Sequence, residues 1–155
     1  MAPQDVPNQK AMTEIAADTM RRVGMNLDYQ AVDWGTMVQR RASKSPPNQG
    51  GWNAFCARFW GSECFSPAAH TTLRSNGIQA WFGWPSSPRI EALREQWIDT
   101  PDPAAQHTLA AEIQAQAFED VPYYPIGFYY SPTAYRADLT GIVSGGPFFW
   151  NIRRT

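Results

Sequence analysis

The sequence predicts an α/β fold, a mixed sheet flanked by helices, followed by an aromatic, β-rich C-terminal segment. Helical and strand periodicities alternate across residues 9–60, two capped helix starts follow at Ser87 and Asp102, and tyrosines and phenylalanines crowd the last third. The chain has 155 residues, 43% of them hydrophobic, so it is long enough to bury a core.

Residues 9–23 have the spacing of an amphipathic helix. Gly24 follows as a C-terminal stop, and residues 25–32 then have the apolar and polar alternation of a strand. The helix is expected to bury a face made of Met12, Ile15, Ala16, Met20 and Val23.

Asp33 is expected to cap a short helix that ends at Arg40 and Arg41. The loop-forming residues 43–51 come next and lead into residues 52–60, which are apolar on both faces. That pattern predicts a buried strand of a parallel sheet. The order helix, strand, helix, strand favours an α/β layer with a right-handed crossover.

The second half begins with a Gly-, Ser- and Pro-rich stretch, residues 61–88. Ser87, with Pro88 behind it, starts a helix with an expected stripe of Ile90, Leu93, Trp97 and Ile98. Asp102 starts a second helix, expected to end before Pro122 and to bury Leu109, Ile113 and Ala117.

The C-terminal third is β-like in composition. Residues 122–142 are aromatic, but their prolines favour edge positions, and residues 148–154 predict one more short strand.

Charge argues against several classes of partner. The chain has 13 Lys and Arg against 14 Asp and Glu, so it lacks the long-range field that attracts nucleic acid or an anionic membrane. No stretch approaches the ~20 apolar residues of a membrane span. The N-terminal residues 1–10 lack the features of a signal peptide.

Cys56 and Cys64 are compatible with a disulfide or with two buried thiols.

The sequence does not support an enzyme. Cys64 and His70 lie six positions apart, but nothing supplies a third residue to orient the imidazole. His107, the other histidine, falls on the polar side of a predicted helix. No GxSxG, phosphate-loop, HExxH or CxxC motif is present, so we expect neither a cofactor nor a metal site.

An ordered set of motifs carries a resemblance to a known family. It consists of a helix followed by R-V-G-M-N-L, then A-V-D-W-G-T-M-V-Q-R, a buried segment ending in W-G-S-E, F-G-W-P-S-S-P-R-I-E-A-L-R-E-Q-W, and the stretch 110–130. From about Val6 to its end the chain resembles the family 5 extracellular solute-binding proteins of ABC importers, of the dipeptide- and oligopeptide-binding type.

The resemblance implies a C-terminal fragment of a longer periplasmic protein. Residues 1–124 would form part of the second lobe of a type II periplasmic binding protein, and residues 125–155 would return to the first lobe. The implied partners are a peptide or small-molecule ligand and a membrane permease. The alternative is a free-standing truncated module that self-associates, as a homodimer for example, without transporting anything.

Glu63 is the foremost candidate binding residue. Peptide-binding members of the family have W-x-x-D at this place, where the Asp pairs with the ligand's ammonium, whereas this chain has Trp60-Gly61-Ser62-Glu63. The predicted strand 52–60 ends just before it, and ligands gather at the carboxyl ends of parallel strands. An ammonium removed from water needs such a carboxylate. A solvated loop acid is the alternative interpretation.

Four further residues are candidates for binding the ligand. Trp60 and Trp81 are as compatible with an apolar ligand wall as with packing under their own loops, whereas Trp84 favours packing. Arg58 interrupts an apolar segment and is expected to meet an acid, with a structural ion pair favoured over a ligand carboxylate. Asn76 predicts a turn first and a polar ligand contact second.

Overall fold

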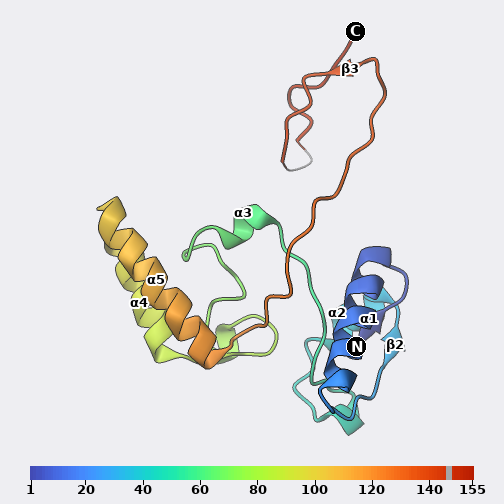
Figure 1. The fold of residues 1–155 in the computed structure, drawn as a ribbon, viewed down its shortest axis with the longest axis vertical. Helices are drawn as coiled ribbons and strands as arrows, with labels where there is room; N and C mark the ends of the chain where they lie inside the picture. Colours follow the sequence, from blue (N-terminus) through green and yellow to red (C-terminus); the bar gives the residue numbers. More distant parts are fainter. Residues whose placement is uncertain (146–147) are drawn as a thin grey trace. The chain divides into compact units, whose positions relative to one another are not determined.

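The computed structural model describes residues 1–145 and 148–155, and the chain divides into two compact units (Figure 1). The first unit is Met1–Tyr124 and the second is Pro125–Thr155. Helices and small sheets are mixed, as the sequence predicts, and each sheet formed by the described residues has two strands. No helix in the described residues is both long enough and apolar enough to cross a bilayer.

The first unit begins with a β-α-β arrangement. Strand β1 (Ala2–Pro3) lies parallel to β2 (Ala31–Val32), and helix α1 (Pro7–Arg22) connects them (Figure 1). The predicted helix is therefore confirmed, and Gly24 behind it adopts a φ of +88°, which suits a helix stop. Of the strand predicted over residues 25–32, only the last two residues, Ala31 and Val32, form a strand, β2.

Helix α1 does not bury the face that its periodicity predicts. The buried residues are Gln9, Thr13 and Ala17, whereas Ile15 and Val23 are 68% and 69% exposed. Periodicity shows which side of a helix is apolar, but the neighbouring elements decide which side is covered. Here α1 packs on β1, and that contact covers a more polar side.

Helix α2 (Trp34–Arg40) forms as expected. One carboxylate oxygen of Asp33 accepts a hydrogen bond from the backbone N–H of Thr36 at 2.9 Å, which caps the helix. Within this helix the side chain of Met37 is fully buried. The hydroxyl and backbone N–H of Thr36 both hold the pKa of Asp33 below its usual range, which keeps the cap ionised.

The prediction of a buried strand over residues 52–60 is wrong. The segment has no regular secondary structure, and Arg58 and Trp60 within it are exposed. A strand needs a neighbouring backbone to pair with, and among the described residues none is aligned with this segment. Apolar composition alone therefore does not make it a strand.

Helices α4 (Pro88–Asp99) and α5 (Pro103–Asp120) lie side by side (Figure 1). Their predicted caps are confirmed, since Ser87 accepts from Ile90 N at 3.2 Å and Asp102 from Ala105 N at 2.8 Å. Ile98 is 55% exposed, so its place in the expected stripe is wrong. The core between the helices consists of Leu73, Ile90, Leu93 and Ile113, with Trp97, Leu109 and Ala117 packed against it.

Short elements connect these helices to the β-α-β arrangement. Helix α3 (Gly61–Cys64) follows the irregular segment, and the 3-10 turns η1 (Pro47–Gln49) and η2 (Gly77–Gln79) lie within the loops.

The second unit contains little regular structure. Strand β3 (Leu139–Thr140) pairs antiparallel with β4 (Arg153–Arg154). The described part of residues 122–138 forms no strand, so the β-rich prediction is wrong for most of this segment, and the predicted strand 148–154 reduces to β4. Prolines at 125 and 132 remove backbone donors from a strand ladder, which is one physical reason.

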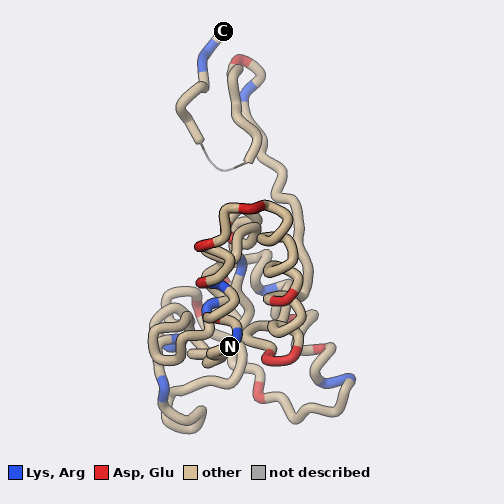
Figure 2. Tube along the Cα trace, turned by 90° about the vertical axis from the view of Figure 1, so that its left-hand side faces the viewer, with Lys and Arg blue, Asp and Glu red and all other residues tan. Residues whose placement is uncertain are grey.

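Acidic and basic residues are interspersed along the chain (Figure 2).

Candidate ligand-binding site

Six aromatic side chains of the first unit form a continuous cluster. The ring of Trp81 lies 5.5 Å from that of Phe55, 5.2 Å from that of Phe59 and 5.3 Å from that of Phe82. Trp52 extends the cluster, at 4.7 Å from Phe55 and 6.2 Å from Trp84. The cluster joins the irregular segment 52–59 to the loop 81–84. We call this set the aromatic cluster: Trp52, Phe55, Phe59, Trp81, Phe82 and Trp84.

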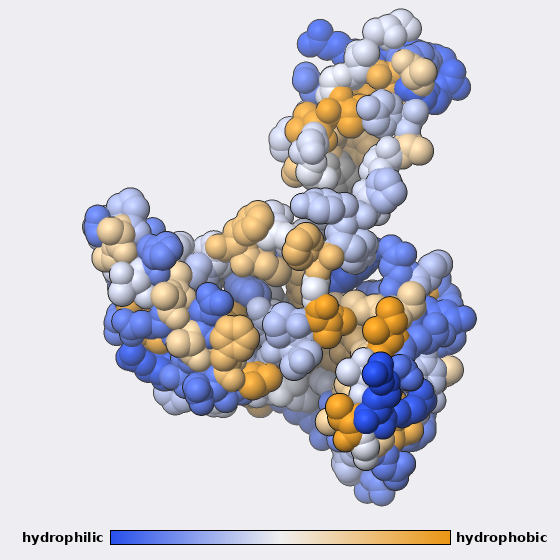
Figure 3. All heavy atoms as spheres, viewed as in Figure 1, coloured by the Kyte–Doolittle hydropathy of each residue, from blue (hydrophilic) through white to orange (hydrophobic). Residues whose placement is uncertain are grey.

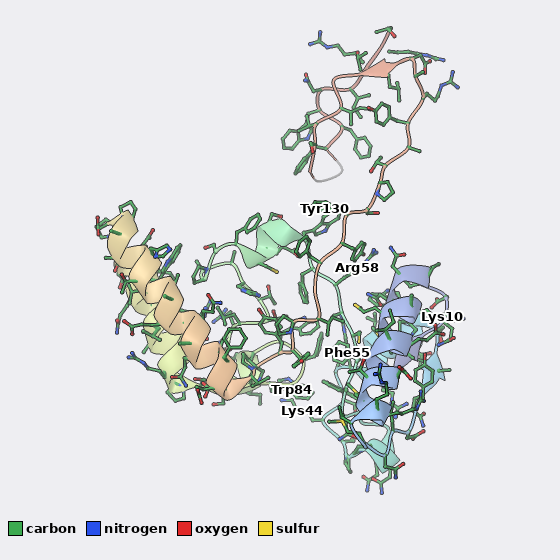
Figure 4. All side chains as sticks on the ribbon, in the orientation of Figure 1. Lys10, Lys44, Phe55, Arg58, Trp84 and Tyr130 are labelled. Carbon is green, nitrogen blue, oxygen red and sulfur yellow. The ribbon has the colours of Figure 1, made fainter. Side chains whose placement is uncertain are left out.

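Two cations lie over the aromatic cluster. The guanidinium carbon of Arg41 is 4.5 Å from the ring centre of Phe82 and 5.7 Å from that of Trp81. The Lys44 ammonium is 4.7 Å from the ring of Trp84, and the two side chains can be found together in Figure 4. Such contacts hold a cation over the electron-rich ring face. They also place Trp84 in a packing role, which its sequence context favours.

A cavity of about 350 Å³ opens beside the aromatic cluster. Trp81 and Arg58 both line it, so the structure brings together two of the five sequence-predicted binding residues. The full lining consists of Val6, Gln9, Trp34, Arg41, Ala57, Arg58, Phe59 and Trp81. No Asp or Glu is present among these described lining residues.

Two residues of the cavity lining each have a polar side-chain atom that is covered by protein and has no hydrogen-bond partner. The two atoms are the side-chain oxygen Oε1 of Gln9 and the Nε of Arg41. Gln9 is only 2% exposed. Among the described residues no carboxylate forms an ion pair with Arg41. Neither residue was predicted from the sequence. The burial of Gln9 depends on which side of α1 is covered, and the sequence does not specify that.

Trp60 and Glu63 are not among the residues that line this cavity. Trp60 is 60% exposed, and Glu63 is exposed in the first turn of α3. The Trp60 backbone N–H donates to the Glu63 carboxylate at 2.9 Å, which fixes the acid at the start of this short helix. Their binding roles therefore stay predictions.

Asn76 lies at a turn between two chain segments. It pairs with Ser86 in an isolated antiparallel bridge, and Gly77 behind it has a φ of +68°, as a turn requires. Its side-chain oxygen is buried without a hydrogen-bond partner. A ligand contact at Asn76 also stays a prediction.

The two cysteines are free thiols in the structure. Cys56 is half-buried and Cys64 is exposed, so the expectation of two buried thiols is wrong for Cys64. Burial raises the pKa of both thiols, and at Cys64 the neighbouring Glu63 carboxylate raises it further. His70 lies 5.4 Å from the ring of Tyr123. In the described part of the chain no three His, Cys, Asp or Glu residues are grouped as metal ligands.

No protein-family model matches the chain. A probable peptide ABC transporter periplasmic-binding protein of Sinorhizobium fredii is 30% identical to it over 151 residues. The match covers 97% of this chain, and the chain spans 28% of that relative's length. The relative is a transporter binding protein and not an enzyme, which supports the resemblance to solute-binding proteins. Nearly the whole chain is thus similar to one part of a periplasmic-binding protein.

Proposed function

We propose that this chain is part of the substrate-binding component of an ABC importer for peptides or related small amine-bearing solutes. The proposal depends on one observation. A probable peptide ABC transporter periplasmic-binding protein is 30% identical to this chain in a match that covers 97% of the chain. In this proposal the family is family 5, residues 1–124 belong to the second lobe and residues 125–155 return to the first. The complete protein acts in the periplasm and delivers its ligand to a membrane permease.

Glu63 is the proposed partner of the ligand's amine. Its carboxylate is exposed and accepts one backbone hydrogen bond, from Trp60. An ionised carboxylate offers about four lone-pair positions, so the remaining ones can accept hydrogen bonds from an ammonium. The exposed ring of Trp60 and the ring of Trp81 contact the apolar remainder of the ligand. Closure of two lobes then excludes water and strengthens the charge pairing.

The test is the substitution Glu63→Gln in the complete protein, with affinity for a set of di- and tripeptides measured by isothermal titration calorimetry. Losing a charge-assisted hydrogen bond should weaken peptide binding about tenfold or more. Glu119→Gln, an exposed carboxylate near the end of α5, is the matched control and should leave affinity unchanged. Unchanged affinity in the Glu63 variant rejects its role, and failure of every peptide to bind rejects peptides as the ligand.

Self-association is the second candidate function, and the exposed aromatic side chains favour it. Phe128, Tyr130 and Trp150 are 87%, 89% and 87% exposed. Figure 3 shows hydrophobic residues at the surface of both units. Exposed apolar surface of this kind drives association in water. Sedimentation velocity on the 155-residue chain should then show a mass that rises with concentration, and a monomer at every concentration excludes this function.

A further inference from the structure

The chain contains one Asn-Gly pair, Asn76 and Gly77. The residues of such a pair react with each other: the glycine backbone nitrogen attacks the side-chain carbonyl carbon of the asparagine and closes a succinimide ring. The side-chain amide nitrogen leaves as ammonia and takes the glycine N–H proton with it. Water then opens the ring to aspartate or to isoaspartate. Glycine favours the attack because it has no side chain that obstructs its nitrogen.

The folded chain holds this pair in an unreactive geometry. The Gly77 N–H donates to the Pro85 carbonyl at 2.9 Å, so the attacking nitrogen is already engaged. Ring closure needs that nitrogen to eclipse Cβ of Asn76 about the Cα–C bond, whereas the Asn76 ψ of 30° keeps the two atoms on opposite sides. The Asn76 side-chain oxygen is covered and has no hydrogen-bond donor among the described residues. The negative charge that the attack creates on this oxygen is therefore not stabilised.

A few backbone contacts keep the pair closed. Besides the bond from Gly77, Asn76 and Ser86 form the isolated antiparallel bridge, and the Ser87 N–H donates to the Ser75 carbonyl at 2.8 Å. We call this pairing of residues 75–77 with residues 85–87 the loop ladder.

The loop ladder should open while the rest of the first unit stays folded. The residues that it encloses are partly in solvent, since Ile78 is 78% exposed. Trp84, next to the ladder, has a φ of +49°, a left-handed conformation that is unfavourable for a residue with a Cβ atom. Opening relieves this strain and breaks few bonds. Regions with these properties open locally more often than the whole domain unfolds.

The isoaspartate product should prevent the loop ladder from closing again. In isoaspartate the main chain runs through the former side chain, which adds a methylene between position 76 and Gly77. The Gly77 N–H and the Ser75 carbonyl then no longer have the spacing that matches Pro85 and Ser87, so the pairing loses its register.

We propose that Asn76 is a site of self-modification: local opening of the loop ladder lets Gly77 attack the Asn76 side chain, and the isoaspartate product keeps the ladder open. Opening and closing are fast compared with succinimide formation, so the rate of modification follows the open fraction. The proposal depends on neither a ligand nor a transport function.

The first experiment follows deamidation of the 155-residue chain by mass spectrometry of its proteolytic peptides in mildly alkaline buffer. In guanidinium chloride Asn76 should convert, and in native buffer it should convert about tenfold more slowly or less. The internal controls are the other asparagines, each followed by a residue with a side chain, and they should remain amides: Asn8, Asn26, Asn48, Asn53 and Asn151. Equal rates at Asn76 in the folded and unfolded chain, or an Asn76 as inert in denaturant as the controls, would refute the proposal.

The second experiment measures the open fraction independently. Opening of the loop ladder releases the Gly77 N–H, so hydrogen exchange at this amide gives the fraction of chains in which the ladder is open. A synthetic peptide of residues 72–81 gives the deamidation rate of the unprotected pair in the same buffer. The rate in the folded chain should equal the product of that fraction and the peptide rate within about threefold, and a larger departure contradicts control by the ladder.

Low concentrations of urea separate local opening from complete unfolding. Local opening exposes little surface, so deamidation of the folded chain should rise only slightly with urea below the unfolding transition. A rise as steep as that of global unfolding would show that the ladder does not open by itself, and the proposal would fall.

The third experiment examines the product in the refolded chain that carries isoaspartate at position 76. Its Ser87 N–H should exchange about tenfold faster or more than in the unmodified chain. Asn76→Asp is the matched control, because it has the same composition and a normal main chain, so its Ser87 N–H should stay protected. Equal exchange at Ser87 in the two chains rejects the role of the added methylene. Exchange at Leu93, in the core of α4, should stay slow in both, and its loss would reject a local effect.

Discussion

The guanidinium of Arg94 donates hydrogen bonds to both carboxylate oxygens of Glu91, each at 3.0 Å, one turn apart on α4. The same guanidinium donates to the carbonyl oxygens of Pro67 and Ala68, at 2.8 Å and 3.2 Å. Glu91 in turn accepts from the backbone N–H of Ser75 at 2.7 Å. This buried pair therefore ties the loop before the helices to α4.

Replacing Arg94 with Met should destabilise the first unit strongly. The Arg94 side chain is only 7% exposed, and its removal leaves the Glu91 carboxylate without its charge partner. Breaking a buried pair in this way costs about 3 kcal/mol or more, whereas an exposed pair contributes about 1 kcal/mol at most. The measurement is urea unfolding followed by circular dichroism.

Arg89→Met is the control for that experiment. Arg89 forms an exposed ion pair with Glu112 at 2.8 Å, so its loss should have a small effect on the free energy of unfolding. Equal losses in the two variants would contradict a special role for the buried pair.

Ser87→Ala should weaken the contact between α4 and α5. The Ser87 hydroxyl accepts from Ile90 N at 3.2 Å as the helix cap and donates to the carboxylate of Asp120 at the end of α5. Loss of both bonds should lower the free energy of unfolding by about 1–2 kcal/mol. Exposed Ser86→Ala serves as the neighbouring control in thermal denaturation, and a similar fall there would disprove the capping role of Ser87.

His70 should make stability fall in mild acid. Burial, and then the charge of Arg94, lower the pKa of His70 below its usual 6.5. The unfolded chain therefore takes up a proton at a higher pH than the folded one, so the free energy of unfolding decreases as pH drops below about 6.5. His70→Gln should flatten the stability profile between about pH 7.5 and 5.5.

His107→Gln provides the comparison, because His107 is exposed on α5. A profile that stays steep after the loss of His70 would assign the acid sensitivity to another group.

Asp138 should hold the second unit together. Its carboxylate accepts from Arg136 at 2.9 Å and from Arg154 at 2.8 Å, and hydrogen bonds from Arg136 and then Arg154 lower its pKa. This stabilisation is complete above the unfolded pKa near 3.8 and is lost as pH falls through the lower folded value. Asp138→Asn should therefore speed amide exchange at Thr155, whose N–H donates to the Asp138 carbonyl at 2.9 Å.

Molar salt should speed the same exchange in the unchanged chain, because the arginines are largely exposed and their charges are screened. Asp99→Asn, an exposed position in the first unit, is the control. Unaltered exchange at Thr155 in the Asp138 variant would show that the backbone pairing alone fixes β3 against β4.

The sequence predicted only part of the candidate site. Arg58 and Trp81 were candidates for binding a ligand and do line one cavity, whereas the other candidates, Trp60, Glu63 and Asn76, are absent from its lining. Gln9 and Arg41 gave no signal in the sequence, since a polar residue on a helix and an arginine at a helix end are ordinary on a surface. Their place in the cavity lining depends on residues that are distant in the chain, such as Trp81.

The sequence by itself determined helices α1, α2, α4 and α5, because their signals are local, whereas α3 gave no such signal. Asp33, Ser87 and Asp102 each cap a helix through a backbone N–H three residues ahead, and no distant residue is needed for that bond. Tertiary structure alone decided that residues 52–60 form no strand and that α1 buries Gln9 in place of Ile15. Strand pairing and burial both require a partner from elsewhere in the chain, and a local pattern does not specify whether that partner is there.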